Sequence, residues 1–364
     1  MSISPFMAPG DRSRRRAHSR RRRRRRRRRA ILAGALVVAI LAALVVLALG
    51  NSHAGHHSPR TARTGAQAQA ATSTAHALSA SGLPLGKPAF TLTGIATPLE
   101  DPVQVGFQTP PRAGLLFNLS TGQVLWERNP FKRLPIASLT KMMTALIAVQ
   151  SAPPDAPVLV TRQAVDAAGS KVGVLPLGRH VRLETMLYGL LLPSGNDAAM
   201  ALAQHVAGSA HHFVQRMNDE AAKLGMGCTR YSSPSGYVDR GNFSCAANLA
   251  LLAHVDLEQP RIASIVRTYT AVLPFPIKGG HLYLYNNNPL LIYGYPGVTG
   301  MKTGYTMAAG KCLVITAERH GVRLGVVVLN SPDPAIQASE LLNSAFEHVY
   351  HQAPVAEPPI PFGV

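Results

Sequence analysis

The chain has 364 residues, 46% of them hydrophobic, and a formal net charge of +19. This length leaves ample room to bury a core, in one large domain or two ordinary ones. The charge is concentrated at one end: residues 1–29 hold 14 arginines and one aspartate, and so carry +13 of the +19. Because the rest of the chain is only mildly basic, we expect no nucleic-acid partner.

Residues 30–49, AILAGALVVAILAALVVLAL, contain no charged side chain. Twenty such residues match one helical crossing of a bilayer. Because arginines stay on the cytoplasmic side, we predict a single-pass membrane protein with a cytoplasmic tail at 1–29 and an extracytoplasmic remainder. A cleaved signal peptide, which would give a secreted protein, stays open as the alternative, although its apolar core is usually shorter.

The rest of the chain divides by composition. Residues 50–104 are rich in Ala, Ser, Thr, Gly, His and Pro, which predicts a flexible linker between the membrane and a folded domain. The folded domain is expected at 105–350. Residues 351–364 form a proline-rich tail that is too short for a second domain.

Periodicity predicts an α+β fold for the domain. AGLLFNLSTGQVLWERN predicts a hairpin around Ser120-Thr121-Gly122, and KCLVITAERHGVRLGVVVLN predicts two strands around His320-Gly321. Strands at both ends with helices between them predict an antiparallel sheet assembled from distant segments. The expected helices are at about 138–151, 182–191, 197–206 and 210–224, with a closing helix in PAIQASELLNSAFEHVY.

The three cysteines, Cys228, Cys245 and Cys312, are too few for a disulfide scaffold. Outside the membrane one pair could close, and Cys228 with Cys245 would make the shorter loop. We nevertheless expect all three to be small buried residues.

Ser138 and Lys141 stand three apart at the start of an apolar helical run. Residues at this spacing share a helix face, so a serine that needs a base would lie beside a lysine. Lysine acts as a base only if its ammonium loses its proton easily, which burial or a second cation brings about. A helix cap and a surface charge are the alternative.

Two further segments carry polar residues of the same kind. Ser194-Gly195-Asn196 lies in a turn between two apolar runs, where either an N-cap or residues pointing into a cleft would fit. Lys302-Thr303-Gly304 comes just before a predicted strand. It would supply the second cation, a hydroxyl, and a glycine that exposes the N–H of Tyr305.

In this order, Ser-x-x-Lys, Ser-x-Asn and Lys-Thr-Gly form the signature of penicillin-binding proteins and serine β-lactamases. The sequence most resembles the low-molecular-weight D-alanyl-D-alanine carboxypeptidases of peptidase family S11. The resemblance covers about 108–332, through IASLTKMMTALIA, GSKVGVLPLG, MLYGLLLPSGNDAA, FVQRMNDEAAKLGM and MKTGYTMAAGKCLV. It implies a β-lactamase/DD-peptidase-like domain, with an antiparallel sheet flanked by helices and a helical subdomain, here preceded by one transmembrane helix.

The resemblance also implies a function, removal of the terminal D-alanine from peptidoglycan stem peptides that end in D-Ala-D-Ala, through an acyl-enzyme. β-Lactams would be covalent inhibitors, and the protein would take part in cell-wall synthesis and cell shape. No cofactor or metal is implied. Where family members carry Asn-Pro-x-Gly-Leu, this chain has Ser232-Ser233-Pro234-Ser235-Gly236-Tyr237, so the role of that loop stays open. The resemblance further implies a role for each motif residue. Ser138 would be the nucleophile, Lys141 its general base, and Ser194 the group that relays a proton to the leaving D-alanine. Asn196 would hold the substrate peptide, Lys302 and Thr303 would bind its terminal carboxylate, and the N–H groups of Ser138 and of Tyr305, the residue that follows Gly304, would form the oxyanion hole.

Three alternatives share the signature. A β-lactamase commonly supplies a glutamate for the hydrolytic water, and neither Glu220 nor Glu258 stands in the expected Glu-x-x-x-Asn loop. A penicillin-sensing or wall-binding protein would be expected to have lost a motif residue, and none is lost. An endopeptidase that cleaves crosslinks would use the same site and stays open.

Overall fold

The computed structural model describes residues 90–95 and 101–355. The predicted cytoplasmic tail, the membrane span at 30–49 and most of the linker lie outside these residues, as does the end of the chain from 356. Among the helices that are described, none combines the length and the apolar character that a bilayer crossing requires.

A five-stranded antiparallel sheet organises the domain, with the strand order β2-β1-β11-β10-β9. Leu115 on β1 pairs with Val327 on β11, which in turn pairs with Val314 on β10. The prediction of a sheet assembled from both ends of the domain is thereby confirmed. The strands are β1 (Ala113–Asn118), β2 (Val124–Arg128), β9 (Val298–Thr306), β10 (Gly310–Arg319) and β11 (Val322–Ser331).

Successive strand residues point to opposite sides of the sheet. Both faces are buried, each in a hydrophobic core of its own. Leu313 and its same-face neighbours pack under helix α10 (Pro334–Ser344). Val314 belongs to the other, larger core, which helix α7 (Ala246–Leu257) covers. This second core continues into the helices that hold the site.

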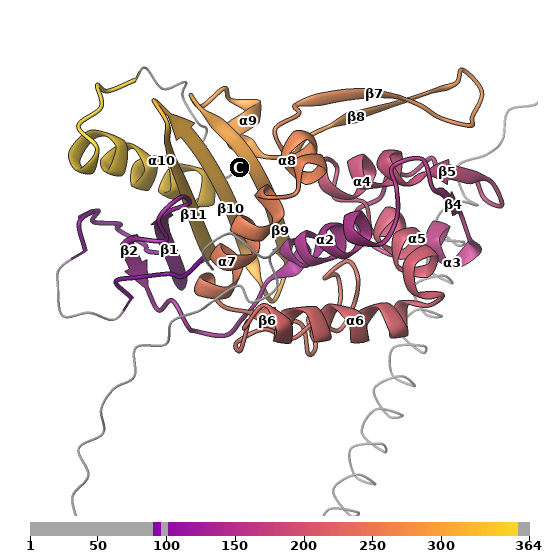
Figure 1. Cartoon of the computed structure of the whole chain (residues 1–364), viewed down its shortest axis with the longest axis horizontal. Coiled ribbons are helices and arrows are strands. Elements are labelled where there is room, and N and C mark those ends of the chain that lie inside the picture. Colours follow the sequence, from indigo (N-terminus) through magenta and orange to yellow (C-terminus); the bar gives the residue numbers. More distant parts are fainter. Residues whose placement is uncertain (1–89, 96–100, 356–364) are drawn as a thin grey trace, which may run out of the picture. The chain divides into compact units, whose positions relative to one another are not determined.

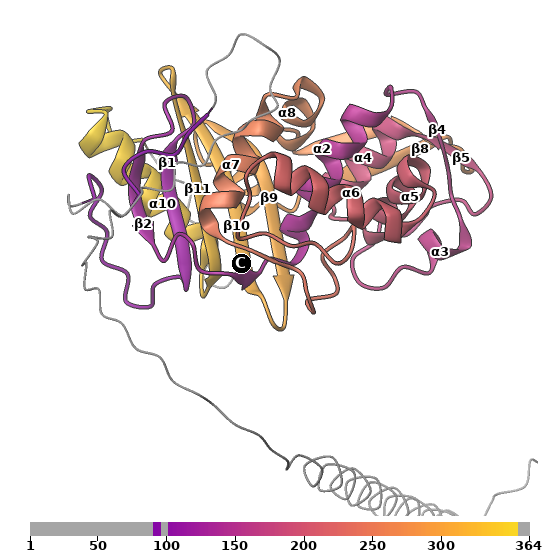
Figure 2. The ribbon, with the colours of Figure 1, turned by 60° about the horizontal axis from the view of Figure 1, so that its bottom comes forward.

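The helices from α2 to α6, between residues 141 and 223, gather beside the sheet rather than over it (Figures 1 and 2). The predicted helices at 182–191, 197–206 and 210–224 are confirmed within one or two residues, whereas α7 and α8 were not predicted. The elements are η1 (Ala137–Thr140), α2 (Lys141–Ser151), α3 (Arg162–Val165), α4 (Leu183–Leu191), α5 (Asn196–Ala207), α6 (Ala210–Lys223), α8 (Pro260–Val266), α9 (Pro289–Ile292) and the closing π-helical turn η2 (Ala345–Val349).

Three short antiparallel ribbons complete the domain. They are β3 (Leu134–Pro135) with β6 (Phe243–Ser244), β4 (Pro157–Leu159) with β5 (His180–Arg182), and β7 (Thr270–Pro274) with β8 (His281–Tyr285). The sequence analysis predicted none of them. The β7–β8 hairpin is the longest of the three, and it spans the top of the helical part in Figure 1.

The folded body begins before the predicted boundary at residue 105. Phe90 is buried, and its ring stacks on the His254 ring with 3.9 Å between centroids. The N–H of Thr93 donates to the carbonyl oxygen of Gly122 (3.0 Å), and Val124 N–H donates back to Thr93 (2.9 Å). The linker prediction is therefore wrong for residues 90–95, since a few apolar side chains in a polar stretch suffice to dock them.

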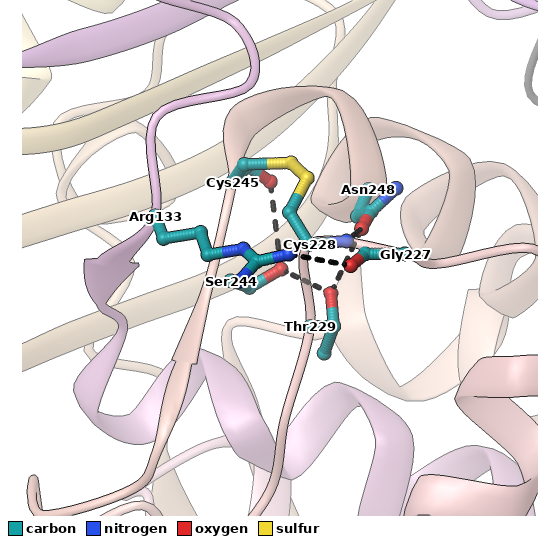
Figure 3. The surroundings of a disulfide bond; sticks show 7 residues. All are labelled: Arg133, Gly227, Cys228, Thr229, Ser244, Cys245 and Asn248. Carbon is teal, nitrogen blue, oxygen red and sulfur yellow. Dashed lines mark hydrogen bonds between the residues drawn. A yellow bond between two sulfur atoms is a disulfide. The ribbon is translucent and has the colours of Figure 1, made fainter. Parts of the chain in front are cut away.

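Cys228 and Cys245 form a disulfide, whereas the sequence analysis favoured reduced cysteines (Figure 3). Cys245 is the N-cap of α7, and the N–H of Cys228 donates to Asn248 Oδ1 on the same helix (2.9 Å). Residues 228 and 245 are thus brought together by α7, which the sequence analysis did not predict. Cys312 is free and buried, as expected.

Candidate active site

Ser138 lies in the 3-10 turn η1, and Lys141 is the first residue of α2. The sequence predicted one continuous α-helix over both residues, and the tighter turn corrects this. Because residues i and i+3 nearly eclipse in a 3-10 helix, the predicted adjacency persists. Lys141 Nζ lies 2.8 Å from Ser138 Oγ.

Lys141 is fully buried, with a relative exposure of 0%. Its Nζ also donates to Asn196 Oδ1 (2.7 Å) and to the carbonyl oxygen of Ser235 (2.8 Å). Burial lowers the pKa of Lys141 well below its ordinary value, the charge of Lys302 lowers it further, and Asp197 opposes both. A neutral amine in this position can accept the proton of the Ser138 hydroxyl.

Ser194 occupies the turn between α4 and α5 with a positive φ of 65°. Gly195, and not Ser194, is the N-cap of α5, so the helix-cap alternative is wrong. The Oγ of Ser194 is buried and, within the part of the chain that the structure describes, has no hydrogen-bond partner. A buried hydroxyl without a partner is costly unless something else meets it, such as a bound substrate.

Asn196 uses both ends of its side-chain amide within the protein. Oδ1 accepts from Lys141, and Nδ2 donates to the carbonyl oxygen of Ala168 (2.6 Å). Its backbone N–H donates to Ser170 (2.7 Å). In this structure Asn196 therefore orients the lysine and ties down the loop at 168–173. The predicted contact between Asn196 and a substrate peptide stays a prediction.

Lys302, Thr303 and Gly304 lie within the edge strand β9, not just before a strand as predicted. The glycines and threonines of GVTGMKTGYT hide the strand from a hydropathy pattern. Lys302 is buried, and this burial lowers its pKa to about 7. Its positive charge also lowers the pKa of Lys141, so Lys302 is the second cation that the sequence analysis required for a lysine base.

Strand β9 passes very close to the nucleophile turn at Gly304. A Cβ added there would lie 2.9 Å from the carbonyl oxygen of Ile136 and 3.2 Å from the backbone nitrogen of Ser138. Only glycine allows the two backbones to approach in this way. The approach brings β9 beside the N–H of Ser138, as an oxyanion hole built from Ser138 and Tyr305 would require.

Asn287 is a cavity residue that the sequence analysis missed. Thr303 Oγ1 donates to Asn287 Oδ1 (3.0 Å), while the N–H of Asn287 donates to the carbonyl oxygen of Leu192 (3.2 Å). Asn287 thus contacts β9 through its side chain and the start of the turn that carries Ser194 through its backbone. The run Asn286-Asn287-Asn288 after an apolar strand was the available signal.

The loop whose role was open holds the lysine. Besides the Ser235 contact, the carbonyl oxygen of Pro234 accepts from Thr144 Oγ1 (2.6 Å) on α2. Gly236 has φ 75°, and an added Cβ would clash with the carbonyl oxygen of Ala137. The departure from the family pattern therefore preserves backbone contacts to the site.

These residues surround one cavity of about 400 Å³. Lys302 and Lys141 lie beneath it, buried, rather than in its wall. In the described ranges, no three His, Cys, Asp or Glu side chains gather where they could hold a metal. The cavity is lined by Ser138, Ser170, Ser194, Asn287, Pro289, Thr303, Gly304, Tyr305, Lys311, Cys312, Leu313 and Pro334.

A serine held against a buried lysine, with a second serine and a lysine-bearing edge strand around one cavity, defines a serine acyl-transfer site of the penicillin-binding class. The model of the D-alanyl-D-alanine carboxypeptidase family, peptidase S11, matches residues 106–333. The chain belongs to this family. The resemblance stated from the three motifs is thereby confirmed.

Individual relatives bear different activities in their names. The chain is 32% identical over 243 residues to D-alanyl-D-alanine carboxypeptidase DacF of Bacillus subtilis, covering 65% of this chain and 62% of that protein. It is 32% identical over 242 residues to a D-alanyl-D-alanine endopeptidase of Pseudomonas aeruginosa, covering 62% of this chain and 77% of that protein. The structure of the Streptomyces K15 DD-transpeptidase matches with a TM-score of 0.62 at 28% identity, over 67% of this chain and 99% of that one.

Proposed function

We propose that the protein is a serine-type D-Ala-D-Ala carboxypeptidase that removes the terminal D-alanine from peptidoglycan stem peptides through an acyl-enzyme on Ser138. The observation that carries the proposal is the 2.8 Å contact between Ser138 Oγ and the buried Lys141 Nζ. Family membership supplies the substrate class, since the matching model is that of D-alanyl-D-alanine carboxypeptidases.

In the proposed mechanism, acylation begins at Ser138. Neutral Lys141 takes the hydroxyl proton as Ser138 Oγ forms a bond to the carbonyl carbon of the penultimate D-alanine. The negative charge on the carbonyl oxygen is stabilised by the N–H groups of Ser138 and Tyr305. The C–N bond then breaks, and the leaving amine takes the proton that Lys141 accepted, relayed by the hydroxyl of Ser194, so that Lys141 is neutral again. Water hydrolyses the ester in a second, equivalent cycle.

In this proposal the edge strand β9 orients the substrate. A carboxypeptidase substrate ends in a free carboxylate, which a charged Lys302 and the Thr303 hydroxyl are placed to attract. If the carboxylate binds to this strand, the scissile carbonyl would lie next to Ser138. Gly304, which has no side chain, leaves room for it there. The same features would accept the carboxylate of a β-lactam.

The shared site keeps an endopeptidase as the second candidate, because the Pseudomonas aeruginosa relative bears that name. None of the described residues that line the cavity is a glutamate, which disfavours a β-lactamase that deacylates through a glutamate-bound water. All three motifs are intact, which disfavours a purely sensing protein.

Release of D-alanine from a soluble peptide ending in D-Ala-D-Ala tests the proposal, with the full chain and a Ser138→Ala control. Release by the wild type that disappears in the control establishes both the activity and the nucleophile. A folded wild type that becomes acylated by penicillin but releases no D-alanine would overturn the carboxypeptidase proposal. Crosslinked dimeric peptides would then test the endopeptidase.

We also propose the arrangement expected from the sequence: a cytoplasmic tail at 1–29, a membrane anchor at 30–49, and a catalytic domain on the cell-wall side. The apolar run flanked by arginines supports it. Fractionation of cells that express the full chain and a chain lacking residues 1–49 tests it. Recovery of the full chain in the soluble fraction, without cleavage, would contradict the anchor.

A further inference from the structure

The β7–β8 hairpin buries one face and presents the other to solvent. Leu282 and Leu284 on the inner face are buried in the core that the helices share. On the outer face Val272 pairs with Tyr283, and these side chains are 56% and 64% exposed. Tyr285, on the same face, is 63% exposed. The hairpin therefore holds two large aromatic rings outward on an anchored support.

One end of the outer face lies close along the chain to a residue that lines the cavity. Tyr285 stands two residues before Asn287, a distance of about 7 Å along an extended chain. Asn287 lines the cavity, donates its N–H to Leu192, and accepts from Thr303. A polymer whose end is bound in the cavity would therefore pass close to the rings of Tyr285 and Tyr283.

The charged side chains in the segment that contains the hairpin are all basic. No aspartate or glutamate occurs between Glu258 and Glu318, and the hairpin itself carries Lys278 and His281. Nothing acidic on the hairpin would repel a ligand that carries peptide carboxylates. A ring with a hydroxyl also offers an apolar face and a hydrogen-bonding edge, the two properties that a sugar ring presents.

We propose that the outer face of the hairpin, formed by Val272, Tyr283 and Tyr285, binds the glycan strand that carries the stem peptide. This inference rests on the proposed function, since it takes the peptide in the cavity to be part of a polysaccharide. The rings stack on sugar faces while the peptide reaches into the cavity. The hairpin thereby favours the polymer over free peptides of the same sequence.

A lipid surface is the other chemistry that exposed apolar side chains serve. Membrane-binding segments combine Trp, Phe or Leu with several basic residues. The outer face of the hairpin exposes two tyrosines and one valine, and Lys278 and His281 are the basic residues between Thr270 and Tyr285. The observations therefore favour the glycan.

The test compares Tyr283→Ser/Tyr285→Ser with a matched control, Leu159→Ser/Leu177→Ser, whose two leucines are each 44% exposed at the β4–β5 ribbon. The full chains, in detergent and with Ser138→Ala to prevent turnover, are sedimented with insoluble peptidoglycan and with glycan stripped of its peptides. Without Ser138→Ala, the same variants are assayed for D-alanine release from a soluble peptide.

We expect the tyrosine variant to bind both polymers roughly fivefold to tenfold more weakly, the effect of losing interface anchors, while the control binds normally. Its D-alanine release from the soluble peptide should stay within about twofold of the wild type, because neither ring lines the cavity. Unchanged sedimentation would overturn the inference. So would a loss seen only with the peptide-bearing polymer. A wild type that binds glycan but releases no D-alanine would instead contradict the proposed function alone.

Discussion

Gly304 on the edge strand and Ser138 in the nucleophile turn approach so closely that a Cβ on the first would lie 3.2 Å from the backbone nitrogen of the second. The two residues are far apart in the sequence, and each belongs to a different motif. Their contact fixes the distance between the nucleophile and the strand that would bind substrate. The site therefore depends on backbone packing as much as on the catalytic side chains.

Replacing Gly304 by alanine should force the strand away from the turn. We expect kcat/KM for D-alanine release to fall on the order of 100-fold, the cost of misplacing one oxyanion donor. Gly106→Ala is the matched control, because an added Cβ at Gly106 meets nothing within 4 Å. A Gly304→Ala enzyme with wild-type kcat/KM would show that the approach is not needed.

The pH dependence of substrate binding should follow Lys302. Its pKa is lowered to about 7, so the side chain loses its positive charge as the pH rises through this value. A substrate with a free carboxylate should therefore show a rising KM between about pH 6 and 9. In Lys302→Arg the cation persists at all these pH values, and KM should stay level. A level KM in the wild type would contradict the assignment.

Asp256 should make the domain less stable as the pH rises. It is fully buried on α7, neither carboxyl oxygen has a partner among the described residues, and burial raises its pKa well above 3.8. Between the unfolded and folded pKa values the folded state binds more protons, so the unfolding free energy falls with increasing pH.

Asp256→Asn removes this titration while keeping the shape of the side chain. At pH 7 we expect its unfolding free energy to exceed that of the wild type by on the order of 1–2 kcal/mol. Near pH 3 the difference should vanish, because the carboxyl is then protonated in both states. Urea unfolding at both pH values measures this, and an equal difference at each would refute the role of Asp256.

The disulfide, which encloses the loop that contacts Lys141, should raise the unfolding free energy of the domain. Cys228 and Cys245 are 17 residues apart, and the segment between them includes Ser235 and Gly236. Closing a loop of this length is worth about 3 kcal/mol, chiefly through the unfolded chain. Cys228→Ser/Cys245→Ser should lose about that much in urea unfolding, whereas Cys312→Ala, the free cysteine, should lose clearly less. An equal loss in both would attribute the effect to core packing.

Relationships between residues that are close in the chain could be predicted from local sequence patterns. Ser138 and Lys141 are neighbours because they are three apart in a helical turn, and Ser194 is in a turn because two apolar helical runs meet there. Apolar runs around a short turn likewise specified two antiparallel hairpins, β1 with β2 and β10 with β11. These features depend on a few consecutive residues, so their periodicity and turn residues suffice.

The distant groups that complete the site are brought to it by tertiary packing. Asn196 and Ser235 reach Lys141 across separations of 55 and 94 residues, and Asn287 joins two walls of the cavity from a loop. Strand β9 is poor in apolar residues, so its position at the sheet edge comes from pairing with β10. Such contacts depend on how the elements pack, which no local pattern encodes.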